Sequence, residues 1–185
     1  VTVDLGRSTA QSTGFDTATL VNIEGINGSD YDDVITGNSG DNRFEGRGGN
    51  DTFNIGSGGH DTLLYKLINA SDATGGNGHD VVNGFTVGTW EGTADTDRID
   101  LRDLLSGSGY TGTGSASYVN GVATLDSGAG NISDYIRVVQ NGSNTEIQVD
   151  LDGTGGQFSP TTLVTLNGVQ TDLATLLANH QLLIA

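Results

Sequence analysis

The sequence predicts an all-β protein: a parallel β-roll, or β-solenoid, with bound calcium, followed by a β-rich C-terminal portion with one short helix. The first observation behind this prediction is a nine-residue repeat between Gly28 and Leu64. The second is the composition, with 30 Gly among 185 residues and 23 acidic residues, of which only four are Glu. The third is a hairpin signal, the turn NGSN between two strand-like segments, in the C-terminal half.

The repeat occurs four times, as GSDYDDVIT, GNSGDNRFE, GRGGNDTFN and, after the extra residue Ile55, GSGGHDTLL. Its first position is always Gly, and its fourth is Gly in every copy except at Tyr31. The sixth position carries Asp or Asn: Asp33, Asn42, Asp51 and Asp61. The eighth position is always apolar: Ile35, Phe44, Phe53 and Leu63. A flexible linker needs no apolar residue at every eighth position, so the pattern favours a folded repeat.

The spacing indicates a metal-binding turn joined to a short strand. Glycines allow positive φ and expose backbone carbonyls in the turn, and the middle side chain of the three-residue strand that follows points inward. Two repeats complete one coil, so turns two repeats apart stack at about 4.8 Å. Asp33 should then face Asp51, and Asn42 should face Asp61. Carbonyls and carboxylates between stacked turns form the oxygen-only ligand set that calcium prefers.

The N-terminal part divides into two predicted regions. Residues 1–27 should hold strands that lead into the roll, at Val1–Leu5 and Thr19–Ile26. Residues 28–105 should form the roll and its closing segment, with parallel strands at 34–36, 43–45, 52–54 and 62–64. By pattern, GGNGHDVVN at 75–83 is a fifth repeat with Asp80 and Val82 in register.

Residues 106–185 form the predicted β-rich C-terminal region. Strands are expected at Ser117–Leu125, Tyr135–Gln140, Thr145–Leu151 and Leu163–Leu166, and in the last apolar residues. One helix is expected around Leu173–Leu177, with Thr171 or Asp172 as its N-cap. In the turn DLDGTGG, Asp150 and Asp152 could hold another ion, although a solvated turn explains the two carboxylates equally well.

The composition excludes several functions. The net charge of −16 argues against nucleic acid or an anionic membrane as a partner. With no Cys and three His, disulfides and zinc sites are not expected. No apolar run is long enough for membrane insertion, and no secretory signal peptide is visible. The motifs G-x-S-x-G and H-E-x-x-H are both missing, so we expect no enzyme.

The repeats, the run DRIDLRDLL at 97–105, the element VDLDGTG at 149–155 and the apolar C-terminal end together resemble the C-terminal region of large bacterial repeats-in-toxin (RTX) adhesins. In that family the region is an uncleaved type I secretion signal. The resemblance implies a secreted or cell-surface module that folds on extracellular calcium, with the type I secretion machinery as its partner. It also offers a second interpretation of HDVVNGF at 79–85, as the start of the segment that closes the roll.

An alternative function is a calcium-dependent ligand-binding roll, like those attached to alginate-modifying epimerases. Such a roll needs a basic or aromatic groove to hold an acidic sugar, and the chain is poor in both kinds of residue, with one Trp, Trp90, and seven cations, so a neutral glycan stays open as the ligand. Under either function we expect a monomer that binds several calcium ions. The candidate ligands are Asp30, Asp33, Asn42, Asp51, Asp61, Asp80, Asp97, Asp150 and Asp152.

Overall fold

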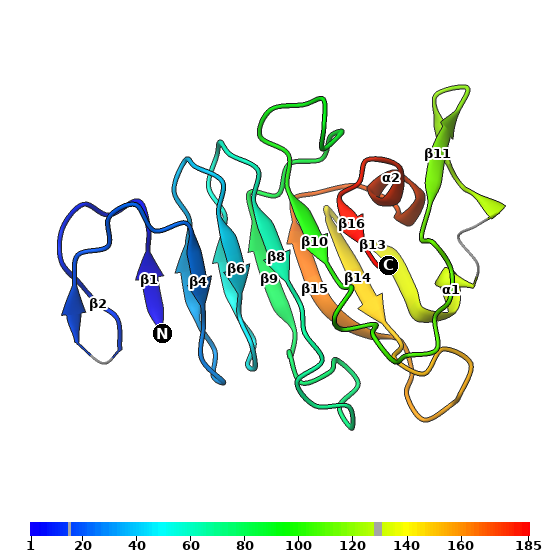
Figure 1. The fold of residues 1–185 in the computed structure, drawn as a ribbon, viewed down its shortest axis with the longest axis horizontal. Coiled ribbons are helices and arrows are strands. Elements are labelled where there is room, and N and C mark those ends of the chain that lie inside the picture. Colours follow the sequence, from blue (N-terminus) through cyan, green and yellow to red (C-terminus); the bar gives the residue numbers. More distant parts are fainter. Residues whose placement is uncertain (15, 128–130) are drawn as a thin grey trace.

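The computed structural model describes residues 1–14, 16–127 and 131–185, which form mostly strands with two short helices (Figure 1). Two sheets make up the body of the molecule. The seven-stranded sheet holds, in spatial order, β1 (Thr2–Asp4), β5 (Val34–Thr36), β7 (Thr52–Asn54), β9 (Asp80–Asn83), β15 (Thr161–Asn167), β14 (Asn144–Val149) and β13 (Ile136–Asn141). The five-stranded sheet holds β16 (Leu182–Leu183), β10 (Arg98–Asp100), β8 (Thr62–Leu64), β6 (Arg43–Glu45) and β4 (Gly25–Asn27).

The repeat strands alternate between these two sheets. β4, β6 and β8 pair in parallel in one sheet, while β5, β7 and β9 pair in parallel in the other. The four predicted strands are confirmed as β5 to β8, and their apolar residues Ile35, Phe44, Phe53 and Leu63 are at most 1% exposed. The Phe44 and Phe53 rings, from opposite sheets, lie 5.9 Å apart. Consecutive repeats lie in opposite sheets and bury their apolar side chains in one shared core, as a β-roll requires.

The N-terminal residues begin the seven-stranded sheet. β1 confirms the strand predicted at Val1–Leu5 and pairs in parallel with β5, so that Val3 lies beside Ile35. The strand predicted at Thr19–Ile26 is wrong in extent, because the structure has only β3 (Thr17–Ala18) and β4 (Gly25–Asn27) there. β3 pairs with β2 (Gln11–Ser12) in a small hairpin.

Gln11 covers the free edge of β1. Its side-chain oxygen accepts the Asp4 N–H at 2.8 Å, and its side-chain nitrogen donates to the Asp4 carbonyl at 2.6 Å. The buried amide thus takes the place of a neighbouring strand at this point. Unpaired edges invite association with other chains, so Gln11 protects this end of the sheet.

The repeat register continues beyond Leu64 despite two long loops. Val82 of β9 pairs with Phe53, which confirms the register of the predicted fifth repeat. Ile99 of β10 pairs with Leu63 in the other sheet, so DRID at 97–100 occupies the same positions as the last four residues of a repeat. Residues 79–83 and 97–100 therefore continue the repeat pattern, one stretch in each sheet.

The C-terminal portion adds strands to both sheets instead of standing apart. β15 pairs in parallel with β9 and carries the antiparallel strands β14 and β13, which confirm the predicted hairpin. β16 pairs in parallel with β10 and confirms the predicted terminal strand. The C-terminal end thus lies against the roll, and α2 (Leu173–Ala178) and β11 (Ala116–Val119) lie at the end of the molecule opposite the N-terminus (Figure 1).

Two predictions in this portion were wrong. The single strand expected at Ser117–Leu125 is a hairpin of β11 and β12 (Val122–Leu125), because Asn120 and Gly121 have φ of 51° and 79° and form a turn. The structure also has two short helices instead of one, since α1 (Ile132–Tyr135) precedes β13. The predicted helix is α2, and Asp172 caps it by accepting the Thr175 N–H.

Stacked turns leave no room for a side chain at Gly49. Its φ is +115°, and a Cβ there would lie 2.4 Å from the Tyr31 carbonyl carbon in the neighbouring turn. We expect Gly49→Ala to lower the free energy of unfolding in calcium by about 2–4 kcal/mol, from backbone strain and overpacking together. The matched control is Gly142→Ala, where φ is +62° but the space is open, so that only the strain of about 1–2 kcal/mol remains. Equal losses in denaturant titrations of the two variants would contradict this close stacking.

Candidate calcium sites

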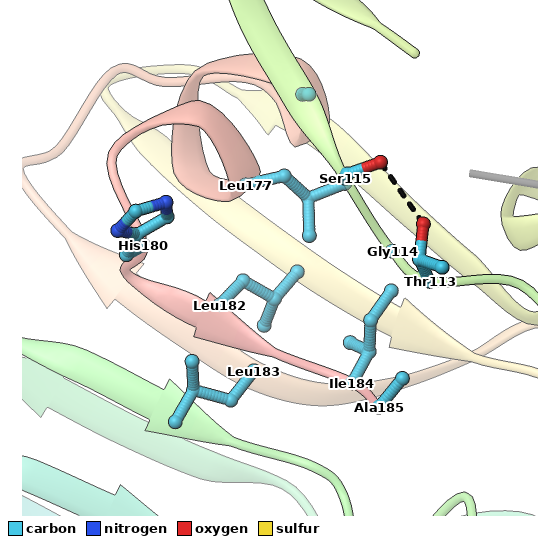
Figure 2. A pocket seen from close by; sticks show the side chains of 10 residues that line it. Thr113, Gly114, Ser115, Leu177, His180, Leu182, Leu183, Ile184 and Ala185 are labelled. Atoms are coloured by element: carbon cyan, nitrogen blue, oxygen red, sulfur yellow. Dashed lines mark hydrogen bonds between the residues drawn. The ribbon is translucent and has the colours of Figure 1, made fainter. Parts of the chain in front are cut away.

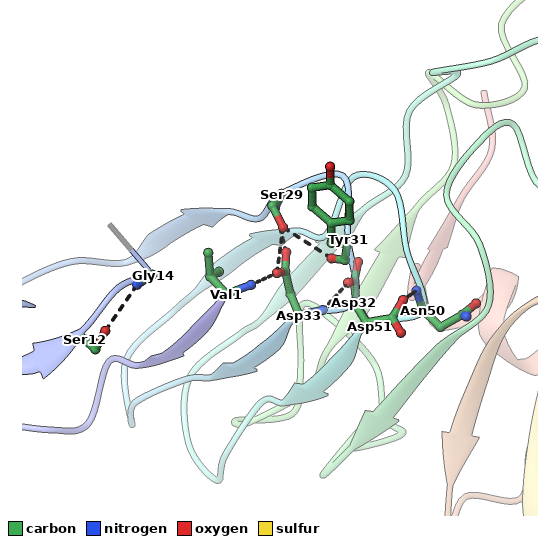
Figure 3. A network of polar contacts seen from close by, with 9 residues as sticks. All are labelled: Val1, Ser12, Gly14, Ser29, Tyr31, Asp32, Asp33, Asn50 and Asp51. Atoms are coloured by element: carbon green, nitrogen blue, oxygen red, sulfur yellow. Dashed lines mark hydrogen bonds and ion pairs between the residues drawn. The ribbon is translucent and has the colours of Figure 1, made fainter. Parts of the chain in front are cut away.

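Three sixth-position residues of the seven-stranded side stack in what we term the first ladder: Asp33, Asp51 and Asp80. The Asp33 N–H donates to Asp51 Oδ1 at 2.8 Å, as predicted from the spacing, and the Asp51 N–H donates to Asp80 Oδ1 at 2.8 Å. At the N-terminal end, the Val1 amino group donates to Asp33 Oδ1 (Figure 3). Each carboxylate therefore uses one oxygen to hold the backbone of the preceding turn.

The five-stranded side has an equivalent second ladder: Asn42, Asp61 and Asp97. The Asn42 N–H donates to Asp61 Oδ1 at 2.8 Å, and the Asp61 N–H donates to Asp97 Oδ1 at 3.1 Å. The facing of Asn42 and Asp61 is thus confirmed despite the inserted Ile55. Asp97 also accepts the Thr86 N–H through its other oxygen, at 2.8 Å. The second ladder therefore extends to Asp97, which lies directly before β10.

Sequence reasoning missed a further row of contacts at the fifth repeat position. Asp32 Oδ1 accepts the Asn50 N–H at 2.7 Å, and Asn50 Oδ1 accepts the His79 N–H at 2.9 Å. On the other side, Asp41 Oδ1 accepts the His60 N–H at 2.8 Å. The signal was present in the sequence, because every copy of the repeat has a polar residue just before its sixth position.

The ladder carboxylates are buried at high electrostatic cost. Asp33, Asp51, Asp61 and Asp80 are at most 2% exposed. Burial, reinforced by the charge of Asp32, raises the pKa of Asp51 to about 7, and burial raises that of Asp80 to about 8. In the second ladder, burial raises the pKa of Asp61 to about 7 and that of Asp97 to about 6. The folded protein therefore disfavours these negative charges unless a cation lies beside them.

The space around the first ladder fits a calcium ion. The buried Oδ2 of Asp51 has no hydrogen-bond partner. A Cβ on Gly28 would lie 2.3 Å from Asp33 Oδ2 and 2.5 Å from the Gly46 carbonyl oxygen, so oxygens of two stacked turns converge there. A Cβ on Gly46 would lie 1.9 Å from Asp51 Oδ2. Glycine at the first repeat position thus leaves room for oxygen ligands from neighbouring turns.

The donor set matches calcium in its chemistry. No three His, Cys, Asp or Glu side chains converge on one point within the part of the chain that the structure describes. A bound cation would therefore be held by one or two ladder carboxylates together with backbone carbonyls, an oxygen-only set typical of calcium. The ion would supply positive charge between carboxylates that burial otherwise disfavours.

The remaining predicted ligands lie outside the ladders. Asp30 is exposed and pairs with Arg47 at 3.0 Å. Asp150 and Asp152 lie in the turn after β14, where Asp150 Oδ1 is buried without a hydrogen-bond partner. Asp152 instead accepts the N–H groups of Gln157 and Phe158 at 2.7 and 3.1 Å. For these three residues, as for the six ladder residues, calcium ligation stays a prediction.

A comparison with known families identifies calcium-binding repeats in the part of the chain where the ladders begin. A family model described as the RTX calcium-binding nonapeptide repeat, in four copies, matches residues 26–53. No curated protein matches the chain. The chain thus contains an RTX calcium-binding repeat module near its N-terminus, of a kind typical of secreted bacterial proteins. Within residues 1–14, 16–127 and 131–185, no helix is long and apolar enough to cross a membrane.

Proposed function

We propose that this chain is the C-terminal module of a secreted or cell-surface RTX adhesin and serves as its uncleaved type I secretion signal. In this proposal the module is a calcium-closed β-roll that folds after export. The observation that carries it is the pair of ladders, whose buried carboxylates need a cation to stay charged. In a cytosol with little free calcium that cation is missing, whereas outside the cell it is abundant.

The position of the C-terminal end supports a link between export and folding. Gln181 is fully buried and donates to the carbonyls of Thr86 and Asp97 at 2.8 and 2.7 Å. Leu182 and Ile184 belong to the shared core and are at most 4% exposed. A folded module therefore buries Gln181, Leu182 and Ile184. An exporter that recognises this end would have to do so while the chain is unfolded.

Folding outside the cell would then give export its direction. A chain that folds around calcium on emerging cannot slide back through a narrow channel, and its recognition segment becomes buried at the same time. We propose no catalytic role, because the ladder carboxylates are buried and accept backbone N–H groups of stacked turns, which leaves them little access to a substrate.

The experiment compares export of three forms of the chain, each fused behind a reporter in a bacterium with a type I exporter. The full chain should appear in the medium, and deletion of residues 171–185 should abolish this. The matched control is Phe53→Ala, which should weaken the folded roll by about 3–5 kcal/mol yet leave the C-terminal end intact. This variant should still leave the cell. Normal extracellular levels of the truncated form would contradict the secretion role.

A further inference from the structure

The sequence contains six Asn-Gly steps, and the structure places them in contrasting environments. They begin at Asn27, Asn77, Asn83, Asn120, Asn141 and Asn167. Asn-Gly is the dipeptide at which a protein chain modifies itself most readily, because glycine has no side chain to keep its backbone nitrogen away from the asparagine amide. The reaction still requires an asparagine side chain and a glycine N–H that are not held elsewhere. The fold therefore determines which of the six steps can react.

The chemistry needs no co-reactant except water. The glycine nitrogen attacks the side-chain carbonyl carbon of asparagine, and the new N–C bond closes a cyclic imide. The side-chain nitrogen leaves as ammonia, which carries away the proton of the glycine N–H. Water then breaks one of the two imide C–N bonds, with its OH going to the carbon and its remaining proton to the nitrogen. The product is aspartate or isoaspartate, and either carries a negative charge that asparagine lacks.

Hydrogen bonds protect the first two steps. The Gly28 N–H donates to the Glu45 carbonyl at 2.7 Å, so the nitrogen that would attack is engaged in the roll. Asn77 is 2% exposed, and its side-chain nitrogen donates to the carbonyls of Lys66 and Thr74 at 2.8 and 2.9 Å. Both steps can react only after the surrounding structure has opened.

Two further steps protect each other across β9 and β15. Asn167 Nδ2 donates to Asn83 Oδ1 at 2.8 Å, and Asn83 Nδ2 donates to Asn54 Oδ1 at 3.0 Å. The Gly168 N–H donates to Asn144 Oδ1 at 2.9 Å. A row of side-chain amides on the seven-stranded sheet thus holds both asparagines.

The step at Asn141 is exposed but tethered. Asn141 Nδ2 donates to Glu146 Oε1 at 2.6 Å, from β13 to β14. Hydrogen bonds to a charged oxygen are stronger than neutral ones. The Asn141 side chain must break this bond before it can turn towards the Gly142 nitrogen, so the reaction is slowed here as well.

The step at Asn120 has none of these restraints. Asn120 and Gly121 form the tip of the β11–β12 hairpin, and both are exposed. In the part of the chain that the structure describes, neither the Asn120 side chain nor the Gly121 N–H has a hydrogen-bond partner. A Cβ on Gly121 would meet no atom within 4 Å, so no neighbouring group hinders movement of this turn.

The tip of the hairpin can rearrange at low cost. β11 and β12 form a two-stranded sheet of their own. Val119 and Val122, which flank the turn, are 55% and 65% exposed. A two-stranded hairpin is at best marginally stable by itself. Little burial therefore opposes the movement that brings the Gly121 nitrogen to the Asn120 side chain.

The base of the same hairpin is fixed to the C-terminal end. Gly114, just before β11, lies directly against the Ile184 side chain (Figure 2). The Tyr118 hydroxyl donates to Asn179 Oδ1 at 2.7 Å, just after α2. Opening is thus confined to the tip, and the rest of the fold stays intact while the step reacts.

We propose that Asn120–Gly121 is a site of spontaneous deamidation, and that it is the one of the six Asn-Gly steps that reacts in the folded protein. The reaction places a negative charge in the stretch 104–125, which has no charged residue. Isoaspartate also lengthens the backbone of the two-residue turn by one atom, so the hairpin tip changes shape. This modification is independent of the export role.

Mass spectrometry of peptides from the full chain tests the proposal. The chain is aged at neutral pH, once in millimolar calcium and once in urea, and the replacement of NH₂ by OH identifies each reacted step. In urea all six steps should react at similar rates. In calcium Asn120 should react at least about tenfold faster than any other step, which corresponds to about 1.4 kcal/mol of additional opening free energy at the protected steps.

Two outcomes of this experiment would overturn the proposal. One is a folded-state rate at any other Asn-Gly step that equals or exceeds the rate at Asn120. The other is a rate at Asn120 that folding lowers as strongly as it lowers the rates of the other five. An isoaspartyl methyltransferase, which labels only isoaspartate, provides an independent count of reacted chains. Asn120→Gln should remove most of this label in calcium, because the longer side chain closes its ring far more slowly.

Variants of Glu146 test whether hydrogen bonding causes the selection. Glu146→Ala removes the acceptor that tethers Asn141 and should raise the folded-state rate at Asn141 about tenfold, as expected for the loss of one charge-assisted hydrogen bond. The matched control Glu146→Gln keeps an acceptor and should raise this rate less. An unchanged rate at Asn141 in Glu146→Ala would overturn the explanation by hydrogen bonding.

Discussion

Removing calcium is expected to abolish most of the β-structure of this chain. The repeat strands are three residues long, the turns are rich in Gly, and the ladders bury carboxylates whose charge opposes folding. Each calcium site adds about 2.7 kcal/mol to the folded state at a hundred times its dissociation constant. Three independent sites would add about 8 kcal/mol, comparable to the whole stability of a typical domain.

Circular dichroism in chelator, followed by titration with calcium, measures this effect. The β-signal should disappear in chelator and return at millimolar calcium, since extracellular modules bind calcium with dissociation constants of about 10⁻⁴–10⁻³ M. Magnesium at the same concentration should not restore it, because the smaller ion demands octahedral geometry and gives up its water reluctantly. A chain that stays fully folded in chelator would rule out the calcium switch.

Asp51→Asn should weaken calcium-dependent folding more than any change outside the ladders. Asp51 is the middle residue of the first ladder, so it contacts the turns of both Asp33 and Asp80. Its Oδ2 is buried and has no hydrogen-bond partner. Asparagine keeps the shape of the side chain but removes the charge. We expect a loss of about 2.7 kcal/mol for each calcium site that fails to form, measured as a higher calcium midpoint in circular dichroism.

The control is Asp126→Asn. The Asp126 carboxylate accepts a hydrogen bond from the Ser117 hydroxyl, and Asp126 lies just after β12, outside any repeat. It should leave the calcium midpoint unchanged, and equal shifts for the two variants would contradict the ligand assignment. The chelated state gives a second readout. Because burial raises the pKa of Asp51 from 3.8 to about 7, its charge at pH 8 opposes folding when no cation is present, and this cost declines as the pH falls from about 7 towards 3.8. In chelator at pH 8, Asp51→Asn should therefore retain at least as much β-signal as the parent chain.

Local sequence alone determined the repeat core of this protein. The period of nine places Gly, Asp and an apolar residue at fixed points of each turn and strand, so the bounds of β5 to β8 follow from the pattern. The same pattern predicted the contacts of Asp33 with Asp51 and of Asn42 with Asp61. These features are predictable because each repeat contacts its nearest neighbours in the same way.

The C-terminal portion was predicted less accurately than the repeats. The hairpin at Asn120–Gly121 was missed as a single strand, although Asn-Gly between apolar residues is a strong hairpin signal. Helix α1 has four residues and no side-chain cap, and nothing in its local sequence marks its start. Propensity alone seldom identifies elements this short, whose existence depends on packing.

Only the tertiary structure decided how the ladders continue past the regular repeats. The spacing between ladder residues changes from 18 at Asp33–Asp51 to 29 at Asp51–Asp80, and reaches 36 at Asp61–Asp97, yet the backbone-to-carboxylate bond is kept. Loops of any length satisfy this bond provided that their ends meet, because closing a longer loop costs little additional entropy. Strand pairing also decided which distant residues share a row: Arg43 and Arg98 are far apart in the sequence, and both pair with Thr62.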